Sequence, residues 1–262
     1  MQIVTLTTDW GLKDWYVGQV KGVLYSRIND VNVVDITHQI PKFDIRMAAI
    51  VVQNACFTYP KGTIHIIDIN TFEGDSKSFI VVKYNDQFFI CTDNGLPSMI
   101  FKGLDVEITD MTNYVADSNY YTYAVLDFFV KIADVLSQTH SLENLGNKKN
   151  DFAVRKEPFT NAQRGNSIEC QIIYIDDYGN AYLNIKDKEF LDILNNRKFE
   201  IFIDVGATIT SFSTSYADKS IAGQPLMTVS SMCNLELAVR GDNFSRLFGK
   251  KVGDKITINI KD

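Results

Sequence analysis

Two aspartates lie in the first predicted turn of the chain and are candidates for binding a sugar. Asp9 directly follows a β-rich run at residues 2–7, and Asp14 precedes a segment with helical spacing that begins near Tyr16. Carboxylates in such a turn can accept hydrogen bonds from a ribose diol, as an acidic residue does in dinucleotide-binding folds. Aspartate is also a common cap of a following helix. The spacing alone leaves both interpretations open.

Asp68 is the second candidate for chemistry because it stands at the end of a nearly continuous apolar run at residues 63–69. Such runs are typical of strands that are buried on both faces of a parallel sheet. A carboxylate at the carboxyl end of that strand can orient a water molecule or a sugar hydroxyl. Capping of the loop at residues 70–76 explains the residue equally well.

Two polar turns follow later strands. Asp93-Asn94-Gly95 comes after a strand-like run that ends at Cys91, and Asp176 precedes Tyr178-Gly179-Asn180 in the C-terminal half. Both compositions are typical of tight turns, in which Asn and Gly adopt left-handed backbone without any function. Phe43 precedes a predicted helix, so it can be a core residue, a hydrophobic staple or a surface on which a base stacks.

The histidines and cysteines do not predict a metal site. His38, His65 and His140 lack metal-ligand spacing to one another or to a nearby cysteine. The sequence has no P-loop, no G-x-S-x-G and no G-x-G-x-x-G motif. The cysteines are widely separated and lie in apolar surroundings: Cys56, Cys91, Cys170 and Cys233. We expect buried free thiols in a cytoplasmic protein, because the cytosol keeps thiols reduced.

The composition excludes several classes of function. The 262 residues are 45% hydrophobic and 22% charged, which is ordinary for a globular protein. The net charge of −6 argues against a nucleic-acid partner, because binding to phosphates needs clustered positive charge. No stretch approaches the roughly 20 apolar residues of a membrane-spanning helix. We therefore expect neither a nucleic-acid nor a membrane partner.

The elements that must position these residues alternate between strand and helix in the first half of the chain. Strand-like runs lie at 2–7, 31–36, 63–69 and 106–109, helical patterns at 16–27, 43–59 and 122–137, and a hairpin at 78–91 around Asn85-Asp86. This alternation predicts an α/β domain with a mostly parallel sheet over residues 1–145. Ligands of such sheets bind beyond the carboxyl ends of the strands, where Asp9 and Asp68 lie.

The second half of the chain has a different pattern. Residues 146–167 are polar, lack a sustained period and predict a linker. Residues 168–262 then contain short strand-like runs at 168–175, 181–185, 199–205, 226–230, 235–239 and 255–260. These runs predict a smaller, mainly antiparallel β domain.

Several of these segments together resemble one known family. The matching segments run in order along the chain: Thr7-Thr8-Asp9-Trp10-Gly11 with Asp14, the run from Val34 to Pro41, Asp93-Asn94-Gly95-Leu96, Asp176 with Tyr178-Gly179-Asn180 and Asn184, and Tyr216-Ala217-Asp218 with Ser231 and Leu235-Glu236-Leu237-Ala238. They resemble the S-adenosylmethionine hydroxide adenosyltransferase and fluorinase family over nearly the whole length of the chain.

The resemblance implies a fold, an assembly and a reaction. Members of the family have an N-terminal α/β domain, a C-terminal β domain and a homotrimeric assembly with active sites between subunits. They attack the 5′ carbon of S-adenosylmethionine with water or halide and expel methionine. The resemblance therefore implies an S-adenosylmethionine hydrolase that forms adenosine and uses neither a cofactor nor a metal.

The resemblance also assigns roles to residues. It implies that Asp68 is catalytic, and that the adenosyl ligand is bound by Asp9, Asp14, Phe43, Asp93, Asn94, Asp176, Asn180 and Ser231. In this assignment Asp9 and Asp14 contact the ribose and the methionine side, and Phe43 forms a wall of the pocket. Asp176 and Asn180 would come from the C-terminal domain of the neighbouring subunit, and Ser231 would face the adenine edge.

The chain departs from the family at two catalytic positions. Hydrolytic members hold the attacking water with an Asp, an Arg and a His. Asp68 matches the Asp, but Asp75 or Ser76 stands where the Arg is expected, with Lys77 beside it, and Ala124 replaces the His. A positioned proton donor or acceptor is worth roughly 10²–10⁴-fold in rate, so we expect slow hydrolysis. A non-catalytic adenosyl-binding protein and altered nucleoside chemistry are the alternatives.

Overall fold

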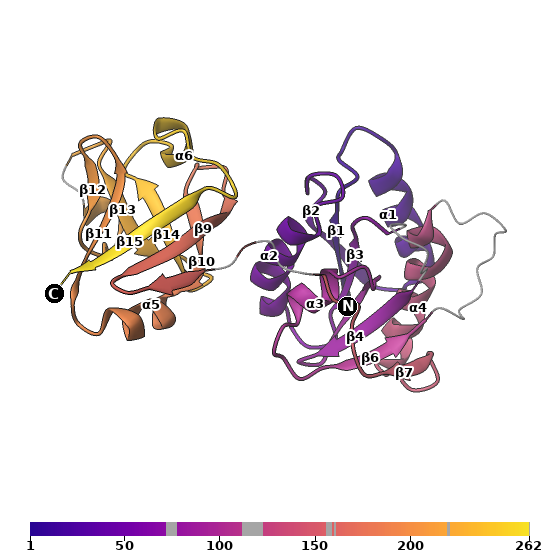
Figure 1. Ribbon diagram of the computed structural model, residues 1–262. Helices are drawn as coiled ribbons and strands as arrows, with labels where there is room; N and C mark the ends of the chain where they lie inside the picture. Colours follow the sequence, from indigo (N-terminus) through magenta and orange to yellow (C-terminus); the bar gives the residue numbers. More distant parts are fainter. Residues whose placement is uncertain (72–77, 112–122, 156–158, 160, 219–220, 262) are drawn as a thin grey trace. The chain divides into compact units, whose positions relative to one another are not determined.

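The computed structural model contains residues 1–262, and the structure describes all of them except 72–77, 112–122, 156–158, 160, 219–220 and 262. The chain divides into two compact units, Met1–Arg155 and Lys156–Asp262 (Figure 1). Among the helices that the structure describes, none has the length and apolar character needed to cross a bilayer.

The N-terminal unit is built on a seven-stranded sheet with the strand order β2-β1-β3-β5-β4-β6-β7. Its strands are β1 (Gln2–Thr8), β2 (Val31–Thr37), β3 (Ile64–Asp68), β4 (Phe79–Tyr84), β5 (Gln87–Thr92), β6 (Glu107–Asp110) and β7 (Asn147–Lys149). The pairings from β2 through β1 and β3 to β5 are parallel. Those from β5 through β4 and β6 to β7 are antiparallel.

The sheet is therefore only partly parallel, and the prediction of a mostly parallel sheet was wrong for the half that contains β4, β6 and β7. The cause is the hairpin at Asn85 and Asp86, whose φ angles of 50° and 59° are those of a tight two-residue turn. This turn reverses the chain between β4 and β5. Strands β6 and β7 then continue the antiparallel pairing outward from β4.

Helices cover both faces of this sheet (Figure 1). One face packs against α1 (Tyr16–Arg27), the π-helix η2 (Val125–Phe129) and α4 (Val130–Thr139), and the other against α2 (Ile45–Ala55), the 3-10 turn η1 (Cys56–Thr58) and α3 (Leu96–Ile100). Because side chains alternate along a strand, Ile64 and Ile66 of β3 enter the first core, whereas Ile67 enters the second. Burial on both faces explains why β3 is apolar along nearly its whole length.

The C-terminal unit is an antiparallel sheet with the order β12-β11-β15-β9-β10-β14-β13, with β8 paired to β9. Its strands are β8 (Ala162–Arg164), β9 (Ser167–Ile175), β10 (Ala181–Lys186), β11 (Lys198–Asp204), β12 (Ala207–Ile209), β13 (Pro225–Val229), β14 (Asn234–Val239) and β15 (Lys255–Lys261), and its helices are α5 (Asp187–Leu194), η3 (Tyr216–Asp218) and α6 (Phe244–Leu247). A bridge between Phe212 and Met227 links the region after β12 to β13, which curls the sheet into a barrel-like form. The prediction of a mainly antiparallel β domain is confirmed.

The segment predicted as a linker, 146–167, contains two short strands. Strand β7 pairs with β6 in the N-terminal unit, and β8 pairs with β9 in the C-terminal unit. The polar composition of the segment concealed both strands, because short edge strands carry few apolar residues. The division between the two units falls after Arg155.

The cysteines differ from expectation at one position. Cys56, Cys91 and Cys170 are buried free thiols, as predicted, but Cys233 is exposed. Cys233 lies in the turn between β13 and β14 with a φ of 57°, and its carbonyl accepts a hydrogen bond from the Asp187 amide. Cys233 therefore belongs to the turn and is not part of the core.

Candidate functional site

The carboxyl ends of β1 and β3 bring two aspartates together. Thr8 of β1 pairs in parallel register with Asp68, the last residue of β3, and Asp9 follows Thr8 directly. Both carboxylates are largely buried, at 8% and 9% exposure. The negative charge of Asp9 is close enough to contribute to raising the pKa of Asp68. Asp9 and Asp68 thus meet at the edge of the sheet at which the sequence predicted a ligand.

Asp68 is held from two sides. The indole Nε1 of Trp10 donates to its Oδ2 at 2.7 Å, and the hydroxyl of Thr71 donates to its Oδ1. Burial raises the pKa of Asp68 to about 6, against the lowering effect of the two hydrogen bonds. The side chain is therefore fixed in orientation and titrates close to neutral pH.

Aromatic rings form a wall beside this carboxylate. Trp10 meets Tyr123 edge-on with ring centroids 5.5 Å apart, and Tyr123 in turn meets Tyr16 edge-on at 5.2 Å. The Tyr123 hydroxyl donates to the Tyr16 carbonyl at 3.1 Å. Burial, Asp68 and Tyr16 raise the pKa of the Tyr123 phenol, which keeps it neutral. The wall excludes water from one side of Asp68 and accounts for the burial that raises its pKa.

The wall is attached to an uncommon helical element. Ala124, at the position where the resemblance implies a histidine, is 2% exposed and leads directly into the π-helix η2. Single π-helical turns are rare and are frequently found at functional sites. Neither Trp10 nor Tyr123 was predicted as a site residue, although Trp10 directly follows Asp9 and Tyr123 directly precedes Ala124. Asp75, Ser76 and Lys77 lie outside the described residues.

Asp9 shapes the loop that carries Phe43. Its Oδ2 accepts a hydrogen bond from the Phe43 amide at 2.8 Å, and its carbonyl accepts one from the Lys42 ammonium. Phe43 has a φ of 66° and is 67% exposed, which excludes the core interpretation. The N-cap of α1 is Trp15, with no side-chain cap hydrogen bond, so the capping interpretation of Asp9 and of the exposed Asp14 fails for this helix.

The side chains of Asp93 and Asn94 form hydrogen bonds with other residues of the chain. The two oxygens of Asp93 accept hydrogen bonds from Lys149 Nζ at 2.6 Å and from the Ala153 amide at 2.9 Å. Asn94 donates to the carbonyls of Ile69 and Asn70 at 2.8 and 2.9 Å. These contacts favour a positioning role, because Asn94 holds the loop that leads from Asp68 to Thr71.

The candidate residues of the C-terminal unit lie in two turns. Asp176 accepts hydrogen bonds from the Asn180 amide at 2.8 Å, from the Asn180 side chain at 3.1 Å and from the Tyr182 hydroxyl at 2.9 Å. The carboxylate of Asp176 is therefore hydrogen-bonded within its own domain. Tyr178, at the tip of the turn, is 81% exposed, and Ser231 is exposed in the turn between β13 and β14.

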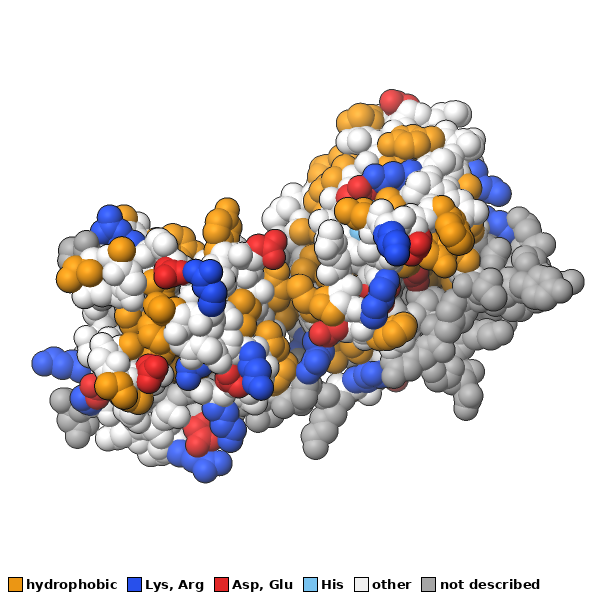
Figure 2. Space-filling view, turned by 90° about the horizontal axis from the view of Figure 1, so that it is seen from above, with side chains coloured by type: hydrophobic (Ala, Val, Ile, Leu, Met, Phe, Trp, Pro, Cys, Tyr) orange, Lys and Arg blue, Asp and Glu red, His pale blue; other side chains and the backbone are white. Residues whose placement is uncertain are grey.

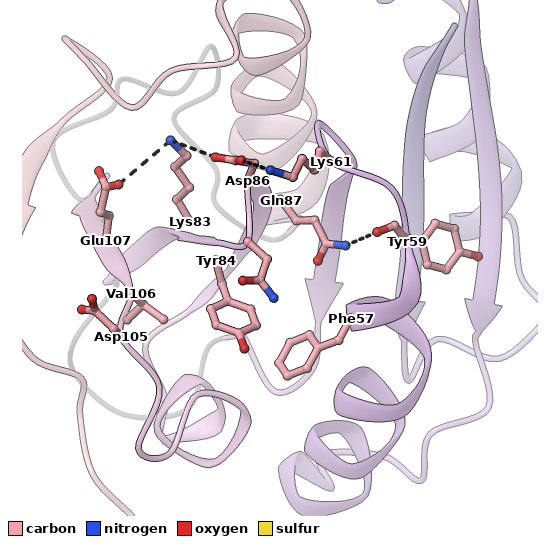
Figure 3. Close-up of a pocket in the computed structure, with 11 residues that line it drawn as sticks. Phe57, Tyr59, Lys61, Lys83, Tyr84, Asp86, Gln87, Asp105, Val106 and Glu107 are labelled. Atoms are coloured by element: carbon pink, nitrogen blue, oxygen red, sulfur yellow. Dashed lines mark hydrogen bonds and ion pairs between the residues drawn. The ribbon is translucent and has the colours of Figure 1, made fainter. Parts of the chain in front are cut away.

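A separate pocket of about 550 Å³ opens at the other end of the strands of the N-terminal sheet (Figure 3). It is lined by the hairpin between β4 and β5, the start of β6 and the segment before β3. Figure 3 shows Lys83 between two carboxylates, and its ammonium lies 3.6 Å from Asp86 and 4.0 Å from Glu107. Lys61 pairs with Asp86 at 2.9 Å. These charges neutralise one another, and none of them faces Asp68.

The described residues contain no group of three or more His, Cys, Asp or Glu side chains arranged to hold a metal. On the face shown in Figure 2, the basic side chains of each unit are scattered among acidic, hydrophobic and other side chains.

Comparisons with known proteins place the chain among adenosyl-group enzymes. The family model for the SAM hydroxide adenosyltransferase N-terminal domain matches residues 4–146, and the model for the C-terminal domain matches residues 170–257. A curated relative named (R)-S-adenosyl-L-methionine hydrolase, from Methanocaldococcus jannaschii, is 27% identical over 200 residues, which cover 72% of this chain and 69% of the relative. Another of the same name, from Salinispora tropica, is 24% identical over 261 residues and 97% of each chain.

Solved structures show the same fold. An uncharacterized conserved protein from Thermotoga maritima superposes with a TM-score of 0.86 at 26% identity, covering 98% of this chain and 100% of the other. A conserved hypothetical protein from Thermus thermophilus superposes with a TM-score of 0.71 at 22% identity over 100% of both chains.

Proposed function

The chain belongs to the S-adenosylmethionine hydroxide adenosyltransferase family, and we propose on this basis that it hydrolyses S-adenosylmethionine to adenosine and methionine. The two family models together match most of the chain, and the curated relatives are named hydrolases of the (R) form of this substrate. The observation that carries the proposal is Asp68, a buried carboxylate fixed by two donors at the carboxyl end of β3.

The proposed reaction is an in-line displacement at the 5′ carbon. Asp68 accepts a hydrogen bond from the attacking water. This bond points a lone pair of the water oxygen at the 5′ carbon. The new C–O bond forms as the C–S bond breaks, methionine leaves with the bonding electron pair, and the proton of the water passes to Asp68 or to solvent. A sulfonium is already a good leaving group, so alignment and desolvation suffice and the reaction needs no cofactor.

The adenosyl group is bound, in this proposal, by the loops around Asp9. Asp9 and Asp14 contact the ribose and the methionine side, and the exposed ring of Phe43 forms a wall of the pocket. The direct hydrogen bond between Asp9 and the Phe43 amide supports a shared role for these two residues. Asp93 and Asn94 would act through the loops that they hold.

We further propose that the protein is a cytoplasmic homotrimer in which the C-terminal unit of one subunit completes the site of the next. Asp176 and Asn180 would contact the sugar or the methionine, and Ser231 the adenine edge. The support is the family resemblance and the exposure of Tyr178 and Ser231 in turns that project from the sheet. We propose no nucleic-acid partner.

Turnover is expected to be slow. Ala124 offers no polar group, so the described side-chain donors on Asp68 are Trp10 and Thr71. Loss of one positioned donor in a catalytic site typically costs about 10²–10³-fold in rate. We expect a rate on the order of 10²-fold or more below that of a site with all of its donors.

The test is incubation with each sulfonium epimer of S-adenosylmethionine, followed by chromatography for adenosine and methionine in equal amounts. Asp68→Asn should abolish most of the turnover. Asp86→Asn, the same change in the pocket at the other end of the strands, should leave it unchanged. Absence of turnover of either epimer, with adenosine still bound, would identify a ligand-binding member of the family instead. Formation of a different nucleoside product would indicate altered chemistry.

A further inference from the structure

The indole of Trp10 is one of the two described side-chain donors that hold Asp68. Its Nε1 lies 2.7 Å from Oδ2, at the short end of the range for N–H···O bonds and typical of a bond to a charged acceptor. Thr71 occupies Oδ1 in the same way. Each carboxylate oxygen has further lone-pair capacity, so the two donors fix the plane of the carboxylate and still leave it able to accept from a water molecule.

The position of the indole is itself determined by its surroundings. The ring stacks on His38 with an interplanar angle of 17° and a centroid distance of 6.0 Å, and it meets Tyr123 edge-on. His38 is held in turn by a hydrogen bond between Thr8 Oγ1 and its Nδ1 at 2.8 Å, and Asp35 Oδ1 lies 3.1 Å from its Nε2. Packing against the rings of His38 and Tyr123 keeps the N–H group aimed at Asp68.

We propose that Trp10 is a positioning residue for the hydrolysis: its indole N–H orients the carboxylate of Asp68 toward the attacking water and favours its ionised form. The inference rests on the proposed function, and it adds a residue that spacing and family resemblance left without a role. A neutral donor is suited to this position, because a hydrophobic wall surrounds it and a second charge would require its own partner.

Among the residues that the structure describes, four titratable groups lie near Asp68 or its indole partner. Asp9 follows β1 and opposes ionisation of Asp68, as burial does. Burial and the charge of Asp68 raise the pKa of the Tyr123 phenol, next to η2, and Tyr16 lies beside that ring at the start of α1. His38 lies behind the indole. The described groups that favour the ionised form are Trp10 and Thr71, so removal of either should raise the pKa of Asp68.

The first experiment compares Trp10→Phe with Trp15→Phe. Phenylalanine at position 10 keeps an aromatic ring in the wall and removes the N–H. Trp15 is 69% exposed, and the ring contact described for it is with Tyr16. A hydrogen bond to a charged group is worth about one to two pKa units. The acid limb of kcat should therefore move up by about one to two pH units in Trp10→Phe, with KM unchanged and most of the rate recovered at pH 9. Trp15→Phe should keep the wild-type profile.

A loss of rate in Trp10→Phe that is equal at every pH would overturn the inference, because it would indicate a purely structural role. Thermal unfolding of both variants controls for a packing defect.

The second experiment does not depend on turnover. The chain has two tryptophans, so Trp15→Phe leaves Trp10 as the only one, and its fluorescence reports on the contact with Asp68. We expect the emission to titrate with a midpoint near the pKa of Asp68, about 6, and this transition to disappear in Trp15→Phe/Asp68→Asn. A titration without hydrolysis would contradict the proposed function and leave the control of Asp68 by Trp10 standing. Hydrolysis without a titration would contradict the role of Trp10.

Discussion

Asp68 combines two requirements that oppose each other. It must be ionised to accept a hydrogen bond and a proton from water, yet the wall of Trp10 and Tyr123 removes it from solvent. Burial raises the pKa of Asp68 to about 6, whereas the ordinary value is 3.8. The folded protein therefore carries a charge that the unfolded chain accommodates more easily, which is a common cost of catalytic carboxylates.

The pH dependence of stability should reveal this cost. Folding raises the pKa of Asp68, so between pH 3.8 and about 6 this carboxyl is protonated in the folded state and ionised in the unfolded chain. Asp68 therefore lowers the stability of the fold as pH rises through that window. In Asp68→Asn this loss of stability is absent, and the stability of the variant relative to wild type should grow by about 2 kcal/mol from pH 4 to pH 7 and then level off. Urea unfolding at a series of pH values measures it.

Asp86→Asn is the matched control. Lys61 holds the pKa of Asp86 below its usual range, so the relative stability of this variant should change in the opposite direction as pH rises. A pH-independent difference for Asp68→Asn would mean that Asp68 is solvated in the folded protein.

Asp9 should contribute to ligand affinity through its charge. Its carboxylate lies beside Asp68 and already orients the Phe43 amide. Asp9→Ala should weaken binding of adenosine by about 1.5–3 kcal/mol, the range for hydrogen bonds to charged groups. Asp9→Asn keeps an acceptor for Phe43 and should lose less. Calorimetry with adenosine, which is not turned over, gives both values, and unchanged affinity in a folded Asp9→Ala protein would refute the assignment.

At the scale of elements, the site depends on the turn after β5 supporting the turn after β3. Asn94 follows β5, and its side-chain Nδ2 donates to the carbonyls of Ile69 and Asn70. Its side-chain Oδ1 accepts from the Leu96 amide at 3.2 Å. The side chain is 9% exposed, so water cannot replace these bonds readily. The order of the loop that carries Thr71 therefore depends on a residue of another strand.

Asn94→Ala should expose this dependence. Removal of a buried side chain that satisfies three backbone groups should destabilise the protein by about 1–3 kcal/mol and lower kcat, because Thr71 is then held less firmly against Asp68. Asn54→Ala is the control: Asn54 bonds to the Ile50 carbonyl of its own helix, and alanine favours helix, so stability and kcat should change little. A loss of stability in Asn94→Ala with kcat intact would separate the turn from catalysis.

At the scale of the whole molecule, the two units contribute different surfaces. The N-terminal unit carries the buried carboxylates, whereas the C-terminal unit presents Tyr178 and Ser231 on exposed turns. The bonds of Asp176 to Asn180 and Tyr182 make the first of these turns rigid without a partner. A rigid, exposed turn is suited to completing a site on another subunit, since little order is lost on assembly.

Mixing of variants tests this arrangement. Light scattering after size exclusion should give three chains per particle. If Asp68 of one subunit and Asp176 of the next share a site, a mixture of inactive Asp68→Asn and Asp176→Ala subunits, reassembled at random, should regain about a quarter of the wild-type rate. A site within one chain would regain nothing, and a stable monomer with full activity would rule out sharing altogether.

The sequence by itself determined the features that depend on local pattern. Periodicity separated an α/β half from a β half, the apolar run at 63–69 located β3, and Asn85-Asp86 located the hairpin. The same reasoning placed Asp9 and Asp68 at the ends of strands, because the residue after a strand is fixed by its neighbours in the chain.

Only the tertiary structure decided which distant residues meet. Trp10 and Asp68 are 58 positions apart, and Asp93 and Lys149 are 56 positions apart, so no local pattern predicts either contact. The order of the sheet brings β1 beside β3, so that Asp9 and Trp10, which follow β1, act on the pKa of Asp68. It also places β7 at an edge of the sheet, where Lys149 pairs with Asp93. The function of this carboxylate depends on its surroundings. These form only when strands that are distant in the sequence pair with one another in the sheet.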